Sequence, residues 1–231
     1  MIYLAGDTHG EFELYKVEDF LKKEASVRTL SKEDYVIILG DVGVCWDGAA
    51  HDERVMQRLN ELPVTVLWID GNHENFDIID SLPVTEWHGG KVQFIGEKII
   101  HLMRGYVYEI EGKKFWAFGG GLSIDKMGRE EGVSWWRREM PSDEEYVRGK
   151  WNLLQQNNEV DYIITHTVPR SVACKLVRRI YPGEEELQYY FQKIAGLATF
   201  KKWYFGHWHM DYESEKYVGL YDEIVCLEEE E

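Results

Sequence analysis

Near its N-terminus the chain reads IYLAGDTHG (residues 2–10), a short apolar run that ends in a polar turn carrying Asp7 and His9. The pattern returns as YVIILGDVG (residues 35–43) and as VTVLWIDGNHE (residues 64–74), with segments of helical character in between. Apolar strands that alternate with helices are typical of parallel βαβ units. The repeat therefore predicts an α/β fold in which the three polar turns meet beyond the carboxyl ends of the strands, where open α/β sheets bind ligands.

The rest of the chain extends this pattern into a single predicted domain, residues 1–231. Short β segments between residues 92 and 121, with a hairpin turn at 111–113, predict a meander that forms a second sheet. Ser142 and Glu145 have the spacing of a helical capping box. Helices are predicted at residues 12–24, 52–61, 142–157, 171–180 and 184–199, and further strands at 162–165, 202–205 and 217–227, the last closing the sheet.

The composition is that of an acidic, well-solvated protein. The chain carries 26 Lys and Arg against 42 Asp and Glu, which gives a net charge of −16 and a pI of about 4.9. This charge disfavours nucleic acid as a partner, because neutralisation of phosphates dominates such binding. A phosphorylated substrate would meet the same repulsion unless bound divalent cations offset it locally.

Cysteine usage and hydropathy favour a cytoplasmic location. The three cysteines, Cys45, Cys174 and Cys226, are odd in number and far apart, so they indicate neither a disulfide framework nor a zinc-binding pair. The first residues lack the basic start and the apolar run of a signal peptide. No segment has the roughly 18 apolar residues that span a membrane. We therefore expect a protein of the reducing cytoplasm without membrane association.

Eight polar residues lie directly after predicted strands. Five are histidines and three carry side-chain oxygen atoms: His9, His73, His166, His207, His209, Asp7, Asp41 and Asn72. Each alone could be an ordinary turn residue, but five strand ends would deliver all of them to one edge of the fold. Ligands of this kind, without thiolates, suit divalent Mn, Fe, Zn or Co. The pairs Asp7/His9 and His207/His209 are each spaced by two, so on an extended strand end both members are expected to point to one side.

Taken in order, these residues form the motifs Asp7-x-His9, Gly40-Asp41, Gly71-Asn72-His73-Glu74, His166 and Gly206-His207-x-His209. Together they resemble the calcineurin-like metallophosphoesterase superfamily over nearly the whole chain. The resemblance implies a four-layer α/β/β/α sandwich with two mixed sheets and a binuclear metal site at the strand C-terminal ends. It also implies the ligands, with manganese the favoured metal: Asp7, His9 and His209 for one ion, Asn72, His166 and His207 for the other, and Asp41 bridging both.

The resemblance further implies the chemistry of the site. Two divalent ions about 3.5–4 Å apart can clamp a phosphoryl oxygen and activate a bridging hydroxide, which attacks phosphorus in line. The chain is therefore expected to hydrolyse phosphomonoester or phosphodiester bonds of a small-molecule or protein substrate. His73 is the motif histidine without a ligand role, and it would protonate the leaving group as general acid. Alternatively, it only donates a hydrogen bond close to the ions.

The sequence departs from the protein Ser/Thr phosphatases of the superfamily. Those enzymes carry an arginine in the second motif and another just before Gly-Asn-His-Glu, whereas this chain has neither and places Asp70 at the second position. This departure weakens the expectation of a protein substrate. Lys126 and Arg129 follow a glycine-rich strand end, and they are predicted to grip the phosphate instead, with Arg104 the next candidate.

Two alternative functions remain open. A nuclease of the same superfamily is disfavoured by the acidic composition and by the lack of an obvious DNA-capping domain. A non-catalytic metal-binding scaffold would require a broken ligand set, and the motifs contain every expected ligand.

Overall fold

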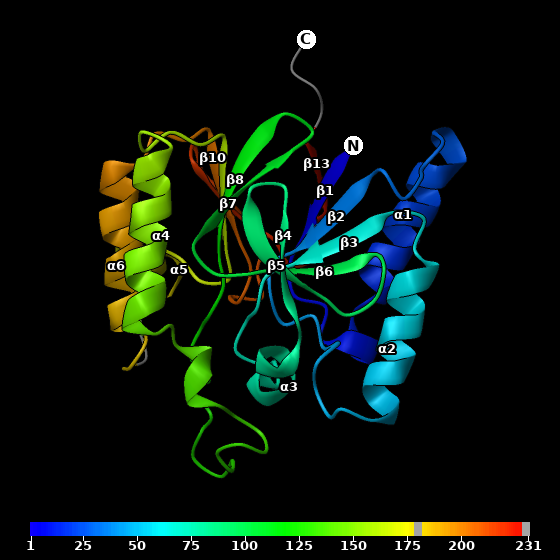
Figure 1. Ribbon diagram of the computed structural model, residues 1–231, viewed down its shortest axis with the longest axis horizontal. Coiled ribbons are helices and arrows are strands. Elements are labelled where there is room, and N and C mark those ends of the chain that lie inside the picture. Colours follow the sequence, from blue (N-terminus) through cyan, green and yellow to red (C-terminus); the bar gives the residue numbers. More distant parts are fainter. Residues whose placement is uncertain (178–181, 228–231) are drawn as a thin grey trace.

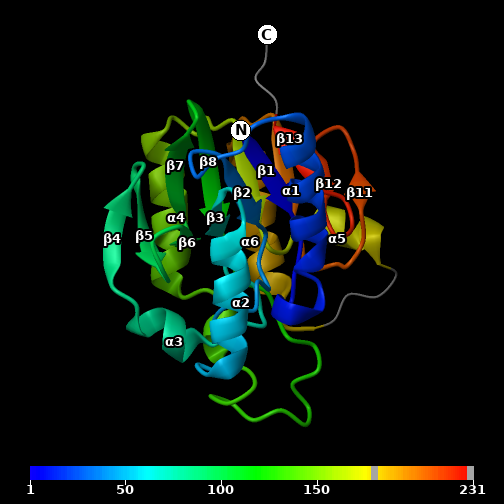
Figure 2. The same ribbon diagram turned by 90° about the vertical axis from the view of Figure 1, so that its right-hand side faces the viewer.

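Two β-sheets pack face to face between helices in the computed structural model, which describes residues 1–177 and 182–227 (Figures 1 and 2). The first sheet has the order β13-β1-β2-β3-β6-β5-β4, with β1, β2, β3 and β6 parallel and the other strands antiparallel. Its strands are β1 (Ile2–Ala5), β2 (Tyr35–Ile38), β3 (Thr65–Trp68), β4 (Val84–Trp87), β5 (Gly90–Phe94), β6 (Ile99–Leu102) and β13 (Val225–Leu227).

The second sheet has the order β11-β12-β10-β9-β8-β7. Its four inner strands are parallel, and an antiparallel strand flanks them at each edge, so this sheet is also mixed. Its strands are β7 (Tyr106–Ile110), β8 (Lys113–Phe118), β9 (Tyr162–Thr165), β10 (Lys202–Phe205), β11 (Tyr212–Glu213) and β12 (Tyr217–Gly219).

Helices cover the outer face of each sheet (Figure 1). Helices α1 (Tyr15–Val27) and α2 (Ala50–Glu61) lie on the first sheet, and α4 (Asp143–Gln155) and α6 (Glu185–Leu197) lie on the second. The shorter elements are α3 (Phe76–Ser81), α5 (Arg170–Leu176) and 3₁₀ turns at Gly10–Phe12 and Arg137–Glu139. No helix in the described ranges combines the length and the apolar character needed to cross a bilayer.

Three apolar cores separate the four layers. Along β1, Tyr3 packs under α1 and α2 while Leu4 packs between the sheets, because successive side chains of a strand point to opposite faces. Burial on both faces explains why the central strands are continuous apolar runs rather than alternating ones. A third core around Trp116 and Phe191 joins the second sheet to α4 and α6. The predicted four-layer α/β/β/α sandwich is confirmed.

Two local predictions are confirmed by backbone geometry. Ser142 is the N-cap of α4, and its side chain and that of Glu145 form the reciprocal capping box. Glu111 and Gly112 connect β7 to β8 with φ values of 52° and 69°, which is the left-handed pair of a tight hairpin turn.

The assignment of strands to sheets was only partly predicted. The segment 92–121 is not one meander, because β5 and β6 join the first sheet and β7 begins the second. The segment 217–227 is divided in the same way between β12 and β13. Apolar residues alone do not show which of two buried sheets a strand joins. The predicted helix at 171–180 ends at Leu176, and its residues 178–180, like the acidic end at 228–231, lie outside the described residues.

Candidate metal centre

The seven predicted ligands converge where the strands of both sheets end. Asp7, His9, Asp41 and Asn72 come from the turns after β1, β2 and β3, and the other three follow β9 and β10 of the second sheet. Donor atoms within 4.8 Å of one another form the groups Asp7–His9–His209, His9–Asp41–His73 and Asp41–His166–His207. Asp41 is therefore shared by groups on both sides of the centre.

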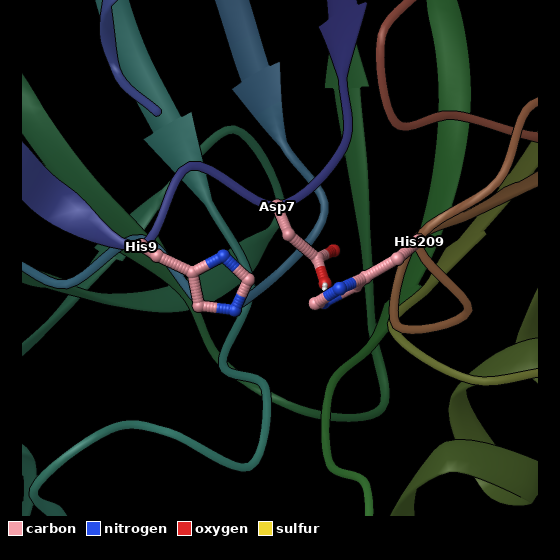
Figure 3. Close-up of side chains that lie close together, drawn as sticks. All are labelled: Asp7, His9 and His209. Atoms are coloured by element: carbon pink, nitrogen blue, oxygen red, sulfur yellow. Dashed lines mark ion pairs between the residues drawn. The ribbon is translucent and has the colours of Figure 1, made fainter. Parts of the chain in front are cut away.

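Asp7 has one satisfied and one free carboxylate oxygen. Its Oδ1 accepts a hydrogen bond from the backbone N–H of His207 at 2.9 Å. Its Oδ2 is buried, has no hydrogen-bond partner among the described residues, and lies 3.2 Å from His209 Nε2 (Figure 3). A buried carboxylate oxygen left without a donor is costly. A cation between Asp7 and His209 would satisfy it, so this part of the structure fits a bound metal ion.

Asp41 is held by one oxygen and faces both groups with the other. Its Oδ1 accepts hydrogen bonds from the backbone N–H groups of Asn72 and His73, both at 2.8 Å. Its Oδ2 lies 3.6 Å from His9 Nε2 and 3.4 Å from His166 Nε2. This orientation would allow Asp41 to contact a cation held by either histidine.

His9, His166 and His207 each have one ring nitrogen close to an oxygen atom of the protein. His9 Nδ1 lies 2.7 Å from Glu13 Oε2, and His166 Nδ1 lies 2.7 Å from the carbonyl oxygen of Leu39. His207 Nε2 lies 3.1 Å from Glu184 Oε1. Such acceptors fix the tautomer of a metal-binding histidine and increase its basicity. The nitrogen atoms that remain available to bind a metal ion are Nε2 of His9, Nε2 of His166 and Nδ1 of His207.

Neither Glu13 nor Glu184 was predicted from the sequence. Glu13 lies four residues after His9, a spacing that could have suggested the contact. Glu184 has no local signal, because it lies on a different element from His207 and meets it only in the folded chain. Burial opposes ionisation of Glu184, yet the hydrogen bonds from His207, Gln188 and Thr167 lower its pKa to about 2.

The two aspartates create a strongly negative centre. Burial alone would lower the pKa of His9, but Asp41, Asp7 and Glu13 raise it to about 9. Burial likewise opposes protonation of His166, yet Asp41 and Asp7 raise its pKa to about 10. Protons and metal ions compete for such nitrogen atoms. The potential that holds protons on these rings is the potential that would attract divalent cations.

The backbone at the centre adopts an uncommon conformation. Positive φ occurs at eight described non-glycine residues, and four of them are predicted ligands: His9 (41°), Asp41 (50°), His207 (67°) and His209 (47°). Left-handed residues of this kind concentrate at functional sites. The extended backbone predicted for the pairs Asp7/His9 and His207/His209 is therefore wrong, because left-handed residues in tight turns bring these side chains to the centre instead.

Glycines let two carboxylates approach the neighbouring turns. A Cβ atom added to Gly71 would lie 2.1 Å from Asp41 Oδ1, and one added to Gly206 would lie 2.2 Å from Asp7 Oδ1. Any larger residue would displace these oxygens from the centre.

The comparison with known families agrees with this geometry. The family model of calcineurin-like phosphoesterases matches residues 1–211. The chain belongs to this family. It is thus a member of a family of metal-dependent hydrolases that act on phosphoester bonds, as the motifs predict. No curated protein matches the chain. Solved structures that are similar include the phosphopantetheinyl hydrolase of Mycobacterium tuberculosis, with 14% identity, a TM-score of 0.47, and coverage of 96% of this chain and 89% of that one.

In this phosphoesterase, His73 belongs to the donor group of His9 and Asp41 and lies among aromatic rings. Its ring centroid is 5.7 Å from that of His9, and the Trp46 ring stacks on it at 6.0 Å with an interplanar angle of 10°. Burial lowers the pKa of His73, Asp41 opposes this shift, and Arg129 and His9 add to it. Its backbone N–H is fixed by Asp41, so the position of the ring is coupled to the shared ligand.

The two cations predicted to grip the phosphate both form ion pairs with carboxylates. Lys126 Nζ lies 3.3 Å from Glu139 Oε2 and 4.3 Å above the Trp135 ring. Arg129 pairs with Asp125 at 2.6 Å. Both side chains lie in the loop after β8, which extends beyond the strand ends (Figure 1).

Arg104 is not available as a replacement for them. Its side chain is 2% exposed and forms an ion pair with Asp70, the residue that stands where the protein phosphatases have an arginine. Its Nη1 also lies 3.4 Å from Glu145 Oε2. The proposed fallback role of Arg104 at the substrate is therefore wrong, because the guanidinium is enclosed by its own partners.

Proposed function

We propose that the chain hydrolyses phosphomonoester or phosphodiester bonds at a centre of two divalent ions. One ion would be held by Asp7, His9 and His209, the other by Asn72, His166 and His207, and Asp41 would bind both. The observation that carries the proposal is Asp41 Oδ2, which faces His9 and His166 at once while its other oxygen is fixed by two amides. When bound, the ions would activate water and neutralise charge on the phosphoryl group, and manganese is the favoured metal.

Asn72 completes the second group. Its Oδ1 lies 3.2 Å from His166 Nε2, and its Nδ2 donates to Ser123 Oγ at 3.2 Å. Ser123 Oγ in turn donates to Glu139, which is fully buried. The amide is thereby oriented with its oxygen toward the histidine, as a metal ligand requires.

His73 would protonate the oxygen of the leaving group. It is the histidine of the Gly71–Glu74 motif that has no assigned ion, and it lines the cavity next to the ligands. The lowered pKa keeps the ring neutral before the substrate arrives. An anionic phosphoryl group beside the ring would favour its protonated form, so His73 would take up a proton as the substrate binds.

The competing functions fit the site less well. A scaffold would have no use for His73 beside a complete donor set. A nuclease would need cations along the path of the nucleic-acid strand, and the cavity lining within residues 1–177 and 182–227 includes neither Lys nor Arg.

The test combines metal analysis with hydrolysis of generic esters. The manganese-loaded protein is expected to contain two ions per chain by elemental analysis and to cleave p-nitrophenyl phosphate or bis(p-nitrophenyl) phosphate. The Asp41→Asn variant is the control for contaminating phosphatases, because it should lose turnover in the same preparation. One ion or none at saturation, or hydrolysis that is equal in the variant, would refute the proposal.

A further inference from the structure

A cavity of about 480 Å³ opens directly onto the proposed metal centre. Its volume is in the range of small-molecule sites. One side is formed by residues of the centre, namely Asp41, Asn72, His73, His207 and His209. Since the phosphoryl group must bind at this side, the remaining space would hold the rest of the substrate.

Apolar side chains also line the cavity, beside the polar Ser123 and Gln188. They are Leu122 and Ile124 from the loop after β8, Val177 at the end of α5, and Trp208 between the two histidines of the last motif. Ile124 remains 58% exposed. Covering these side chains with an apolar group would remove their surface from water, which is favourable in proportion to the area covered.

The charged groups that remain in the lining are two carboxylates, Asp125 and Glu184. Both already have cationic or hydrogen-bonding partners: Arg129 lies 2.6 Å from Asp125, and His207 lies 3.1 Å from Glu184. Among the described lining residues there is no lysine or arginine. A second anionic group on the substrate would thus find no cationic side chain among the described lining residues.

We propose that the substrate is a phosphate ester of an uncharged, mainly apolar alcohol, whose leaving group occupies this cavity. The inference rests on the proposed function and adds the substrate class. His73 lines the same cavity as the metal ligands and the apolar side chains, and in this proposal the ester oxygen would lie beside its imidazole. Phosphate esters with a further anionic group, such as nucleoside di- and triphosphates or bisphosphates, are expected to be poorer substrates, because the described lining offers no lysine or arginine to the extra charge.

Chain length provides the first test. Ethyl phosphate, hexyl phosphate and 5-carboxypentyl phosphate have alcohol leaving groups of similar basicity, so they differ mainly in what enters the cavity. Each methylene group that becomes buried is worth about fourfold. We expect kcat/KM to be at least about tenfold higher for hexyl than for ethyl phosphate, and to fall at least about tenfold again for the carboxylate. If the generic screen shows that only diesters are cleaved, the methyl diesters of the same alcohols replace the monoesters.

Two substitutions at Ile124 test whether the preference for an apolar leaving group arises in this cavity. Ile124→Ser should reduce the hexyl-to-ethyl ratio, and Ile124→Lys should raise the use of 5-carboxypentyl phosphate relative to hexyl phosphate. Val147→Ser on α4 is the matched control, because Val147 is a similarly exposed aliphatic residue (70%) that does not line the cavity. It should leave both ratios unchanged.

The outcomes separate this inference from the proposed function. If no ester is cleaved, including the nitrophenyl esters, the proposed function itself fails. If ethyl, hexyl and 5-carboxypentyl phosphate are cleaved with equal efficiency, or if Val147→Ser changes the ratios as much as Ile124→Ser does, the apolar leaving group is refuted while the hydrolase remains.

Discussion

Replacing Glu184 by glutamine tests whether a buried carboxylate far from the motifs controls metal binding. Glu184 is 5% exposed, and its oxygens accept from four groups. Oε1 lies 3.1 Å from both His207 Nε2 and the Leu122 backbone nitrogen, and Oε2 accepts from Thr167 at 2.9 Å and Gln188 at 2.6 Å. In the Glu184→Gln variant the new amide nitrogen would face Thr167 and Gln188. Both can accept its hydrogen bonds, because the Thr167 hydroxyl can rotate and the Gln188 amide can flip. The amide oxygen would keep its contact with His207 but lose the charge.

The magnitude follows from that loss of charge. A buried hydrogen bond to a charged group contributes about 1.5–3 kcal/mol and a neutral one about 0.5–1.5 kcal/mol, so the difference is about 1.4 kcal/mol or tenfold. This agrees with the roughly 10–100-fold effect of removing the partner of a metal-binding histidine. Because His207 is assigned to one group only, we expect about tenfold weaker binding of one of two manganese ions.

Isothermal titration of the metal-free protein with manganese measures this effect. Glu186→Gln is the matched control, because Glu186 is an exposed carboxylate in the first turn of the same helix. Circular dichroism and thermal unfolding establish that both variants are folded. A folded Glu184→Gln protein with unchanged affinity for both ions would refute the role of Glu184, and so would equal weakening by Glu186→Gln.

Three further predictions concern the centre itself. Asp41→Asn is expected to reduce turnover at saturating metal more than His9→Ala does, because Asp41 faces both ligand groups; near-normal turnover of Asp41→Asn would contradict this. His73→Asn should retain both ions and lose about 10²–10⁴-fold in kcat for esters of poor leaving groups, and much less for p-nitrophenyl esters, whereas equal losses would indicate positioning rather than proton transfer. Without metal, the pKa of about 9 for His9 and of about 10 for His166 keeps both rings protonated at pH 7. Metal binding should therefore release protons, and the affinity for metal ions should rise as the pH increases toward 10. Calorimetry at pH 7 in buffers of low and high ionisation enthalpy would show different heats, and identical heats would disprove proton release.

The fold was largely predictable because its signals are local. The apolar runs of β1, β2 and β3 identify buried parallel strands, and a residue such as Ser142 marks the start of a helix through its own hydrogen bond. Assignment of β5 to one sheet and β7 to the other was not predictable in this way. Both are short strands of mixed polar and apolar residues, and the choice depends on which of their faces becomes buried when the layers pack.

The ordered motifs from Asp7 to His209 determined the family and the residue types available to a metal centre, because motif order and turn chemistry are properties of the chain itself. The tertiary structure alone decided how those groups are used. It pairs Glu184 with His207, leaves Asp7 Oδ2 without a hydrogen bond from the described residues, and encloses Arg104 against Asp70. These contacts join elements that are distant in sequence, and they arise only when two twisted sheets bring their strand ends to one edge. No local sequence pattern encodes contacts between such distant elements. The residues of the centre could therefore be recognised from the sequence, but their charge interactions and hydrogen bonds could not.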